Sequence, residues 1–202
     1  MKNQDSALIV IDVQNDFCSG GALAVPQGEE VVPLINAMLP DYGVRVFTQD
    51  WHPADHKSFA SQHDGKSAFE TVDMPYGPQV LWPDHCVQGT HGAAFHPDLH
   101  TNAADMIIRK GFRRDIDSYS AFFENDRSTP TGLMGYLRTL NVQKVTLAGL
   151  ATDFCVAYSA LDAARLGFEV TVAARACRAI DLDGSLDNAL AELARNAVRV
   201  VD

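Results

Sequence analysis

Three polar side chains stand where the sequence otherwise predicts buried strands or short turns. Asp12 interrupts the apolar run 7–13, Lys110 ends the segment that begins with the apolar residues 107–108, and Cys155 follows a predicted strand by a short turn. A carboxylate, an ammonium group and a thiol together suffice for nucleophilic catalysis, because the acid takes the thiol proton and the cation stabilises both anions. Taken singly, each also has a structural interpretation: a hydrogen-bonded acid, a solvated lysine and a small buried thiol.

Cys155 is distinguished from the other cysteines by its position at the start of a predicted helix. Thr152 is a good N-cap residue, which puts Cys155 at the third helical position, where the helix N-terminus favours the thiolate. No cysteine belongs to a CxxC pair, and without an export signal a disulfide framework is not expected. The remaining three are expected to be buried structural residues: Cys18, Cys86 and Cys177.

A possible metal site lies further along the chain, where all seven histidines fall between His52 and His100. In an extended segment residues two apart point the same way, so Asp50 and His52 converge, and a turn at Pro53 brings His56 back. One carboxylate and two imidazoles are good ligands for a divalent transition metal, although histidines in a solvated loop are also common. The site needs a third histidine, and the spacing alone leaves five: His63, His85, His91, His96 and His100.

The elements that must position these groups are strands alternating with helices. Strands are expected at 7–13, 44–48, 106–108, 145–148, 169–173 and 198–201, and helices at 29–39, 132–140, 152–166 and 185–197. This order predicts an α/β fold of three layers, with a mostly parallel six-stranded sheet and helices on both faces. We expect one domain over 1–202, with a long His-rich loop region at about 51–103. Functional sites gather at the carboxyl ends of parallel strands. Five side chains that follow these strand ends should therefore meet at one rim of the sheet: Asp12, Asp50, His52, Lys110 and Cys155.

Composition narrows the function classes. The chain has 202 residues, 47% of them hydrophobic, and a formal net charge of −10. An acidic chain without a Lys/Arg cluster lacks the charge pattern of a protein that binds nucleic acid or anionic membranes. No apolar run approaches the roughly 20 residues that span a bilayer, and the N-terminus carries no signal-peptide pattern. The sequence therefore predicts a soluble cytoplasmic protein, and a homo-oligomer is compatible with it.

Several motifs occur in the order found in one known family. They are Ile11-Asp12-Val13-Gln14-Asn15-Asp16-Phe17 with Gly20-Gly21, Asp50-Trp51-His52-Pro53 to His56, Trp82-Pro83-Asp84-His85-Cys86-Val87, Lys110-Gly111, Asp117-Ser118-Tyr119-Ser120-Ala121-Phe122 and Ala151-Thr152-Asp153-Phe154-Cys155-Val156. On these residues the chain resembles the bacterial nicotinamidases (pyrazinamidases) of the isochorismatase-like cysteine hydrolase superfamily. The resemblance covers nearly the whole chain and implies the isochorismatase-like hydrolase fold.

The resemblance also implies roles for individual residues. Cys155 is the implied nucleophile, Asp12 the general base and Lys110 the third member of the triad. The implied ligands of one divalent ion, with zinc favoured over iron or manganese, are Asp50, His52, His56 and His85. A cis peptide before Ala151 would turn the N–H groups of Ala151 and Cys155 into an oxyanion hole. Phe17 and Trp82 would flank the substrate ring.

The implied activity is hydrolysis of nicotinamide, and of pyrazinamide, to the acid and ammonia through a cysteine thioester, in NAD salvage. Three alternatives stay open. A related cysteine hydrolase would act on a carbamoyl or ureido substrate, although such relatives generally lack the metal motif. A metal-binding or thiol-redox protein without catalysis would not need Asp12 and Lys110. A metal-bound water as nucleophile would make Cys155 dispensable.

Overall fold

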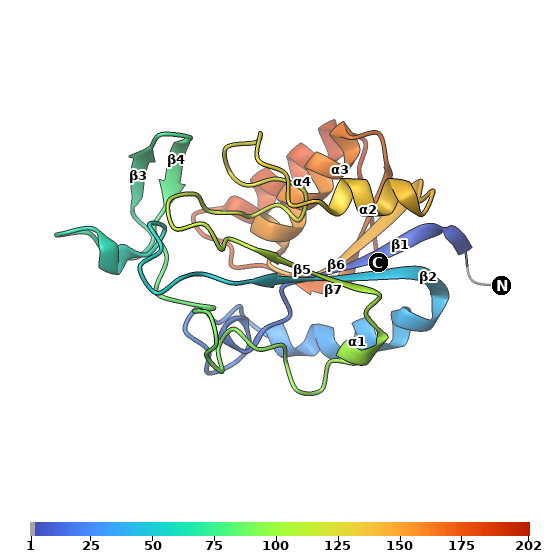
Figure 1. Ribbon diagram of the computed structural model, residues 1–202, viewed down its shortest axis with the longest axis horizontal. Helices are drawn as coiled ribbons and strands as arrows, with labels where there is room; N and C mark the ends of the chain where they lie inside the picture. Colours follow the sequence, from blue (N-terminus) through green and yellow to red (C-terminus); the bar gives the residue numbers. More distant parts are fainter. Residues whose placement is uncertain (1–2) are drawn as a thin grey trace.

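Six parallel strands form the centre of the computed structural model, which describes residues 3–202 (Figure 1). Their order across the sheet is β5-β2-β1-β6-β7-β8. The strands are β1 (Asn3–Ile11), β2 (Tyr42–Asp50), β5 (Met106–Lys110), β6 (Lys144–Leu150), β7 (Glu169–Arg178) and β8 (Arg199–Val201). All six correspond to strands expected from the sequence, and the prediction of a mostly parallel sheet is confirmed.

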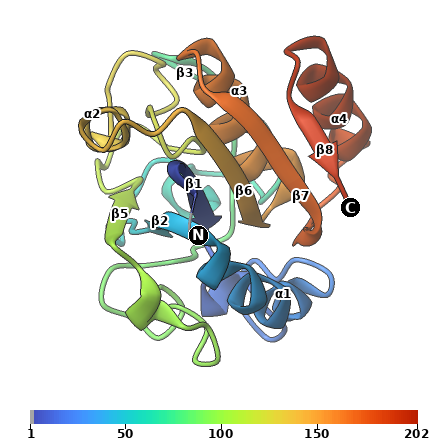
Figure 2. The same cartoon turned by 90° about the vertical axis from the view of Figure 1, so that its right-hand side faces the viewer.

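Helices cover both faces of this sheet, as a fold of three layers requires. Helix α1 (Val31–Met38) lies on one face, and α2 (Leu133–Thr139), α3 (Ala157–Arg165) and α4 (Ser185–Arg195) lie on the other (Figures 1 and 2). Short 3-10 turns at Asn15–Phe17, Gly28–Glu30 and Leu39–Asp41 connect the first elements. Within the part of the chain that the structure describes, no helix is both long and apolar enough to cross a membrane.

The apolar run at the start of the chain explains the position of β1. Residues 7–11 have no exposed surface, because β1 pairs with β2 on one side and β6 on the other while helices cover both faces. A strand buried on both faces needs a continuous apolar sequence rather than an alternating one. The strand ends at Ile11, one residue before Asp12, so Asp12 lies just beyond the sheet at its carboxyl edge.

The His-rich region 51–103 contains more regular structure than the sequence indicated. It holds an antiparallel hairpin of β3 (Thr71–Met74) and β4 (Gly77–Val80), together with 3-10 turns at Ala60–Gln62 and Thr101–Ala103. The prediction missed the hairpin because its strands have only four residues each and are mostly half-exposed, so they show no clear hydrophobic period. The hairpin stands away from the main sheet, beyond its carboxyl edge (Figure 1).

Candidate active site

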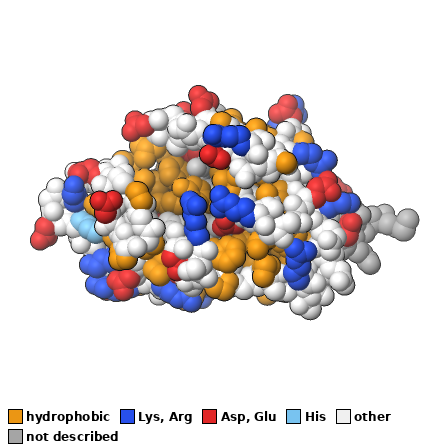
Figure 3. Space-filling model, turned by 90° about the horizontal axis from the view of Figure 1, so that it is seen from above, with side chains coloured by type: hydrophobic (Ala, Val, Ile, Leu, Met, Phe, Trp, Pro, Cys, Tyr) orange, Lys and Arg blue, Asp and Glu red, His pale blue; other side chains and the backbone are white. Residues whose placement is uncertain are grey.

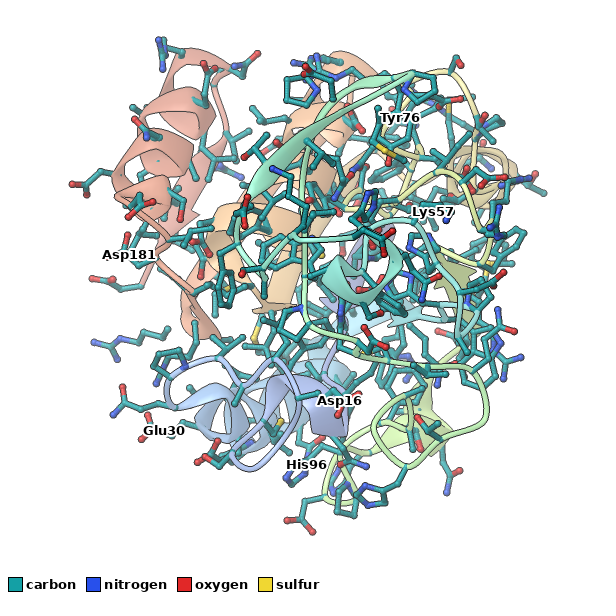
Figure 4. All side chains as sticks on the ribbon, turned by 90° about the vertical axis from the view of Figure 1, so that its left-hand side faces the viewer. Asp16, Glu30, Lys57, Tyr76, His96 and Asp181 are labelled. Atoms are coloured by element: carbon teal, nitrogen blue, oxygen red, sulfur yellow. The ribbon has the colours of Figure 1, made fainter. Side chains whose placement is uncertain are left out.

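The predicted catalytic residues meet beyond the carboxyl ends of β1, β5 and β6. Figure 4 looks onto this end of the molecule, with Asp16, Lys57 and Asp181 coming from separate segments around it. Lys110 is the last residue of β5, and its ammonium group lies at the centre of the cluster. Its Nζ is 2.8 Å from Asp12 Oδ2, 2.5 Å from Asp50 Oδ1 and 3.5 Å from Cys155 Sγ. The structure therefore brings together the three residues of the predicted triad.

The charge of Lys110 is held by its surroundings. The side chain is fully buried, and its Nζ also donates to the carbonyl oxygen of Ser118 at 2.8 Å. Burial alone would lower the pKa of a lysine, but the carboxylates of Asp12 and Asp50 outweigh it and raise the Lys110 pKa well above its usual value. Lys110 is therefore a permanent cation rather than a proton carrier.

Asp12 has the properties of a base that works near neutral pH. Its Oδ1 accepts a hydrogen bond from the Thr48 hydroxyl at 2.7 Å, and its backbone has a positive φ of 46°. Burial raises the pKa of Asp12 to about 6, against the lowering effect of the Lys110 charge. A carboxylate with this pKa is ionised at pH 7 yet takes up a proton easily.

The local structure around Cys155 differs from the expectation. Residues Thr152–Val156 form a π-helical turn, η6, whose N-cap is Ala151 rather than Thr152. The implied cis peptide is present between Leu150 and Ala151, and the Ala151 carbonyl accepts from the N–H groups of Phe154 and Val156. Cys155 thus lies within a widened turn that leads into α3.

The surroundings of Cys155 favour its neutral thiol. Burial raises the pKa of this thiol well above its usual value, and the carboxylates of Asp12 and Asp50 add to the effect, while Lys110 opposes it. Burial thus outweighs the stabilisation of the thiolate that the helix start and the Lys110 ammonium group provide. The Asp12 carboxylate, which contributes to this shift, lies beside the thiol as its candidate proton acceptor.

A candidate metal site adjoins the triad. Ligand atoms of Asp50, His52 and His85 all lie within 4.8 Å of one another, and all three residues are buried. Asp50 Oδ2 is 3.6 Å from His52 Nε2 and 3.9 Å from His85 Nε2. The Nδ1 atoms of both rings face backbone carbonyls at 2.8 Å, those of Gly111 and Pro83, so each Nε2 is left to face the carboxylate.

His56 lies beside this group but is oriented differently. It belongs to a second cluster with His52 and Asp117, and its ring is 4.5 Å from that of His52 between centroids. Its Nδ1 is 2.7 Å from Ser58 Oγ, and its Nε2 is 3.2 Å from the carbonyl of Ile116. Both nitrogens therefore have partners, and the role of His56 as a ligand stays a prediction. None of the metal-ligating clusters among residues 3–202 includes His63, His91, His96 or His100.

Two further residues, which the sequence analysis did not single out, position the predicted metal ligands Asp50 and His52. The Gln14 carboxamide pairs with the backbone of Asp50 twice, since its Nε2 donates to the carbonyl and its Oε1 accepts from the N–H, both at 2.8 Å. Gly111 has φ +63°, and a Cβ there would lie 2.4 Å from Cε1 of His52. Both stand in the quoted motifs, which was the signal available.

A narrow pocket joins the triad to the metal cluster. It is lined by Cys155, Asp50 and His85, and by the two predicted substrate-binding residues Phe17 and Trp82. The Phe17 ring meets the His85 ring edge-on at 5.5 Å between centroids. The wall also includes Ala151, which the family resemblance implied for the oxyanion hole. The sequence analysis gave no role to the other lining residues, which are Leu23, Asp117, Tyr119, Phe154 and Ile180.

A larger hollow lies on the face covered by α3 and α4. Its walls include Tyr76, Phe123 and Tyr158, and it shares Tyr119 and Phe154 with the narrow pocket. Hydrophobic side chains are visible on this face between charged ones (Figure 3). The hollow does not contact the triad cysteine, so the chemistry belongs to the narrow pocket.

Comparison with known proteins agrees with this geometry. The family model described as the isochorismatase domain matches residues 6–202. The chain belongs to the isochorismatase family. A nicotinamidase of Acinetobacter baylyi is 53% identical over 96% of this chain and 90% of its own length. A nicotinamidase of Escherichia coli is 44% identical over 87% of this chain and 84% of its own.

Solved structures of this family superpose closely on the chain. A nicotinamidase/pyrazinamidase of Acinetobacter baumannii has a TM-score of 0.98 at 51% identity, covering 100% of this chain and 98% of its own. An enzyme from L. infantum in complex with nicotinate has a TM-score of 0.87 at 37% identity, covering 100% and 95%. A pyrazinamidase of Pyrococcus horikoshii in complex with zinc has a TM-score of 0.78 at 35% identity, covering 98% and 99%.

Proposed function

We propose that this protein is a nicotinamidase, an amidohydrolase that converts nicotinamide to nicotinate and ammonia through a thioester on Cys155. One observation carries the proposal. The ammonium group of Lys110 contacts Asp12, Asp50 and Cys155 at once, so the hydrolytic triad and the metal-binding carboxylate share one buried cation. A metal-binding or thiol-redox protein without catalysis would not need Asp12 and Lys110 in this arrangement.

Thioester formation begins with the proton on Cys155. Asp12 accepts that proton as sulfur attacks the amide carbon, and the pKa of about 6 makes its carboxylate a base at neutral pH. The C–N bond then breaks, and Asp12 returns the proton to the leaving nitrogen, so that ammonia departs neutral. Lys110 stays protonated throughout and offsets negative charge on sulfur and on Asp12.

In hydrolysis of the thioester, water is the nucleophile and the Cys155 sulfur is the leaving group. Water attacks the acyl carbon, Asp12 takes one of its protons, and the C–S bond breaks with that proton returning to Cys155. We assign the backbone N–H groups of Ala151 and Cys155 to the oxyanion in both steps. Loss of one such donor typically costs about 3–4 kcal/mol of transition-state stabilisation.

The residues present fit a divalent transition metal. One carboxylate and two imidazoles are buried with their ligand atoms within 4.8 Å, and backbone carbonyls fix the Nδ1 side of both rings. We propose Asp50, His52 and His85 as ligands, zinc as the ion, and His56 as a fourth ligand once it exchanges one of its present partners. A bound ion would supply a Lewis-acid contact for the ring nitrogen of the substrate and so orient the ring.

The pocket supports an aromatic amide as substrate. Phe17 and Trp82 both line it, and Cys155 and His85 do so too, so a flat ring held between aromatic side chains reaches both the nucleophile and the metal ligands. The nicotinate complex of the L. infantum relative and the zinc complex of the P. horikoshii relative support the same assignment. Pyrazinamide has the same ring size and an equivalent nitrogen, and we propose it as a second substrate.

The test is nicotinate formation from nicotinamide by the purified, zinc-loaded protein. Cys155→Ala should abolish turnover while zinc content stays unchanged, and Cys177→Ala, which removes a thiol buried in β7, should leave turnover intact. Residual turnover in Cys155→Ala would point to a metal-bound water as nucleophile. A zinc-loaded wild type that ignores nicotinamide and hydrolyses a carbamoyl compound would move the substrate assignment.

The remaining expectations follow from this assignment. We propose that the enzyme acts in NAD salvage in the cytoplasm, and that residues 1–202 form one domain, which the family match over 6–202 supports. Small carboxamides are its partners in this proposal, with neither nucleic acid nor membrane involved. The formal charge of −10 favours that exclusion. Gel filtration with light scattering tests whether the chain forms a homo-oligomer.

A further inference from the structure

Gln79 is a buried amide outside the pocket that contacts the pocket wall. It lies in β4 of the β3–β4 hairpin and is only 1% exposed. Figure 4 labels Tyr76 in the turn of the same hairpin, and Figure 1 shows that this hairpin lies beyond the carboxyl ends of the strands. A buried carboxamide has up to four hydrogen bonds to satisfy, and these determine what Gln79 can hold in place.

The carboxamide of Gln79 is surrounded by matching partners. Its Nε2 lies 2.9 Å from Asp117 Oδ2, 2.8 Å from Tyr119 Oη and 2.8 Å from its neighbour's backbone carbonyl. Its Oε1 accepts from the Tyr76 hydroxyl at 3.2 Å and from Asn125 Nδ2 at 3.1 Å. The hairpin is thus tied to residues 117–125 by one side chain that donates on one side and accepts on the other.

These bonds extend to the aromatic wall of the pocket. Tyr119 Oη also accepts from the indole N–H of Trp82 at 3.1 Å. The rings of Trp82 and Tyr119 both pack edge-on against Phe154, with centroid distances of 4.9 and 5.7 Å. Asp117, Tyr119 and Trp82 line the pocket, whereas Gln79 does not.

We propose that Gln79 is a positioning residue for substrate binding: by donating to Asp117 and Tyr119 it fixes Tyr119, and through the Tyr119 hydroxyl it fixes the Trp82 ring against the substrate. The inference rests on the proposed function, since Trp82 flanks the substrate ring in that proposal. Gln79 contacts the pocket wall but does not line the pocket itself, so its loss affects ring binding more than the chemical step.

Because Gln79 acts as a hydrogen-bond donor, a substitution that keeps its shape but removes the donor tests the proposal. The glutamate of a Gln79→Glu variant has nearly the same shape, but its carboxylate would lie beside the Asp117 carboxylate at the present Nε2 position. The titratable groups in contact with Gln79 are Asp117, Tyr119 and Tyr76. Burial raises the pKa of both phenols, so they stay neutral. Only the protonated form of the introduced carboxyl restores a donor toward Asp117, and burial near a like charge raises the pKa of such a group.

The experiment compares Gln79→Glu, Gln79→Leu and the control Gln62→Glu in the zinc-loaded enzyme. Gln62 lies in the 3-10 turn Ala60–Gln62 of the same loop region and has no bond to the pocket wall. At pH 8 we expect both Gln79 variants to raise KM for nicotinamide roughly tenfold, with kcat within about twofold of wild type. At pH 5.5 the KM ratio of Gln79→Glu to wild type should return toward one, while that of Gln79→Leu should not.

A KM ratio for Gln79→Glu that does not change with pH, or a loss confined to kcat, would overturn the proposal. The indole N–H resonances give a readout independent of turnover. The Trp82 resonance should move in Gln79→Leu, whereas that of Trp51, which stacks on Arg109, should not. If wild type ignores nicotinamide, the proposed function fails, and an unchanged Trp82 resonance would separately reject the positioning role.

Discussion

Replacing Lys110 by methionine removes a charge on which two carboxylates depend. Methionine fills similar space, so the change tests the charge rather than the volume. At an effective dielectric constant of about 20, unit charges 2.8 Å apart, the separation of Lys110 Nζ and Asp12 Oδ2, attract by about 6 kcal/mol. Once Lys110 is gone, protonation of Asp12 offsets part of the lost attraction. Removing one partner of a buried ion pair therefore usually costs about 3–5 kcal/mol. We expect that loss of unfolding free energy, together with loss of turnover.

The loss should grow with pH. Without Lys110, the folded-state pKa of Asp12 rises further above its value in the unfolded chain, from the present value of about 6. A group with a raised folded pKa favours the fold while it is protonated and loses that contribution as the pH rises through the folded pKa. Urea unfolding at pH 5.5 and pH 8, at equal zinc loading, should therefore show a larger deficit for Lys110→Met at pH 8.

A matched control separates this effect from the loss of any lysine. Lys66 forms an exposed i,i+4 pair with Glu70 at 3.0 Å, and Lys66→Met should cost less than about 1 kcal/mol. Adding Asp12→Asn to Lys110→Met should recover part of the stability, because the unpaired Asp12 carboxylate is then gone. It should not restore turnover, because Asp12 is the proposed base. A Lys110→Met protein as stable as Lys66→Met at pH 8, with substantial kcat, would refute the reasoning.

Three further outcomes follow from the same geometry. The wild-type kcat/KM should fall as the pH drops through about 6, since Asp12 then takes up a proton and ceases to be a base. A pH profile at constant zinc occupancy measures this fall. A decline in kcat/KM that begins only near pH 4 would contradict the prediction. His85→Ala should lose far more zinc affinity than His56→Ala, because both ring nitrogens of His56 have other partners. Competition for zinc with a chromophoric chelator gives the affinity of each variant. Equal losses in the two variants would show that His56 is a full ligand. Gly111→Ala should weaken zinc binding about 10–100-fold by displacing the His52 ring, whereas zinc binding unchanged from wild type would show that the ring can move aside.

The sequence predicts the sheet well, for an identifiable reason. A strand buried on both faces leaves a continuous apolar run, and the residues 7–11 of β1 are such a run. The same feature marks Asp12, because an acid that follows directly on such a run lies at the edge of the core. The short hairpin that carries Gln79 has no such pattern in the sequence, since half-exposed strands of four residues show only a weak hydrophobic periodicity.

The contacts within the site depend on strand register, which the sequence does not reveal. Asp50 and Lys110 are direct partners between β2 and β5, and this pairing brings the ammonium group beside the carboxylate that is the predicted metal ligand. A shift by one residue would turn the Lys110 side chain to the other face of the sheet. The preference for His85 came from the family resemblance, and the structure supplies a physical reason: the adjacent Cys86 N–H donates to Asp16 at 2.7 Å and holds that turn in place.

The two oxygens of Asp50 face different parts of the site. Oδ1 contacts Lys110 at 2.5 Å, and Oδ2 faces the Nε2 atoms of His52 and His85 at 3.6 and 3.9 Å. An uncharged replacement of Asp50 therefore removes at once a predicted metal ligand and an anion that supports the Lys110 charge. Inactivity of an Asp50 variant therefore does not show whether loss of the ion or loss of support for the Lys110 charge is the cause. Substitution of His85 separates the two, since its side chain faces the predicted metal cluster and has no bond to the triad.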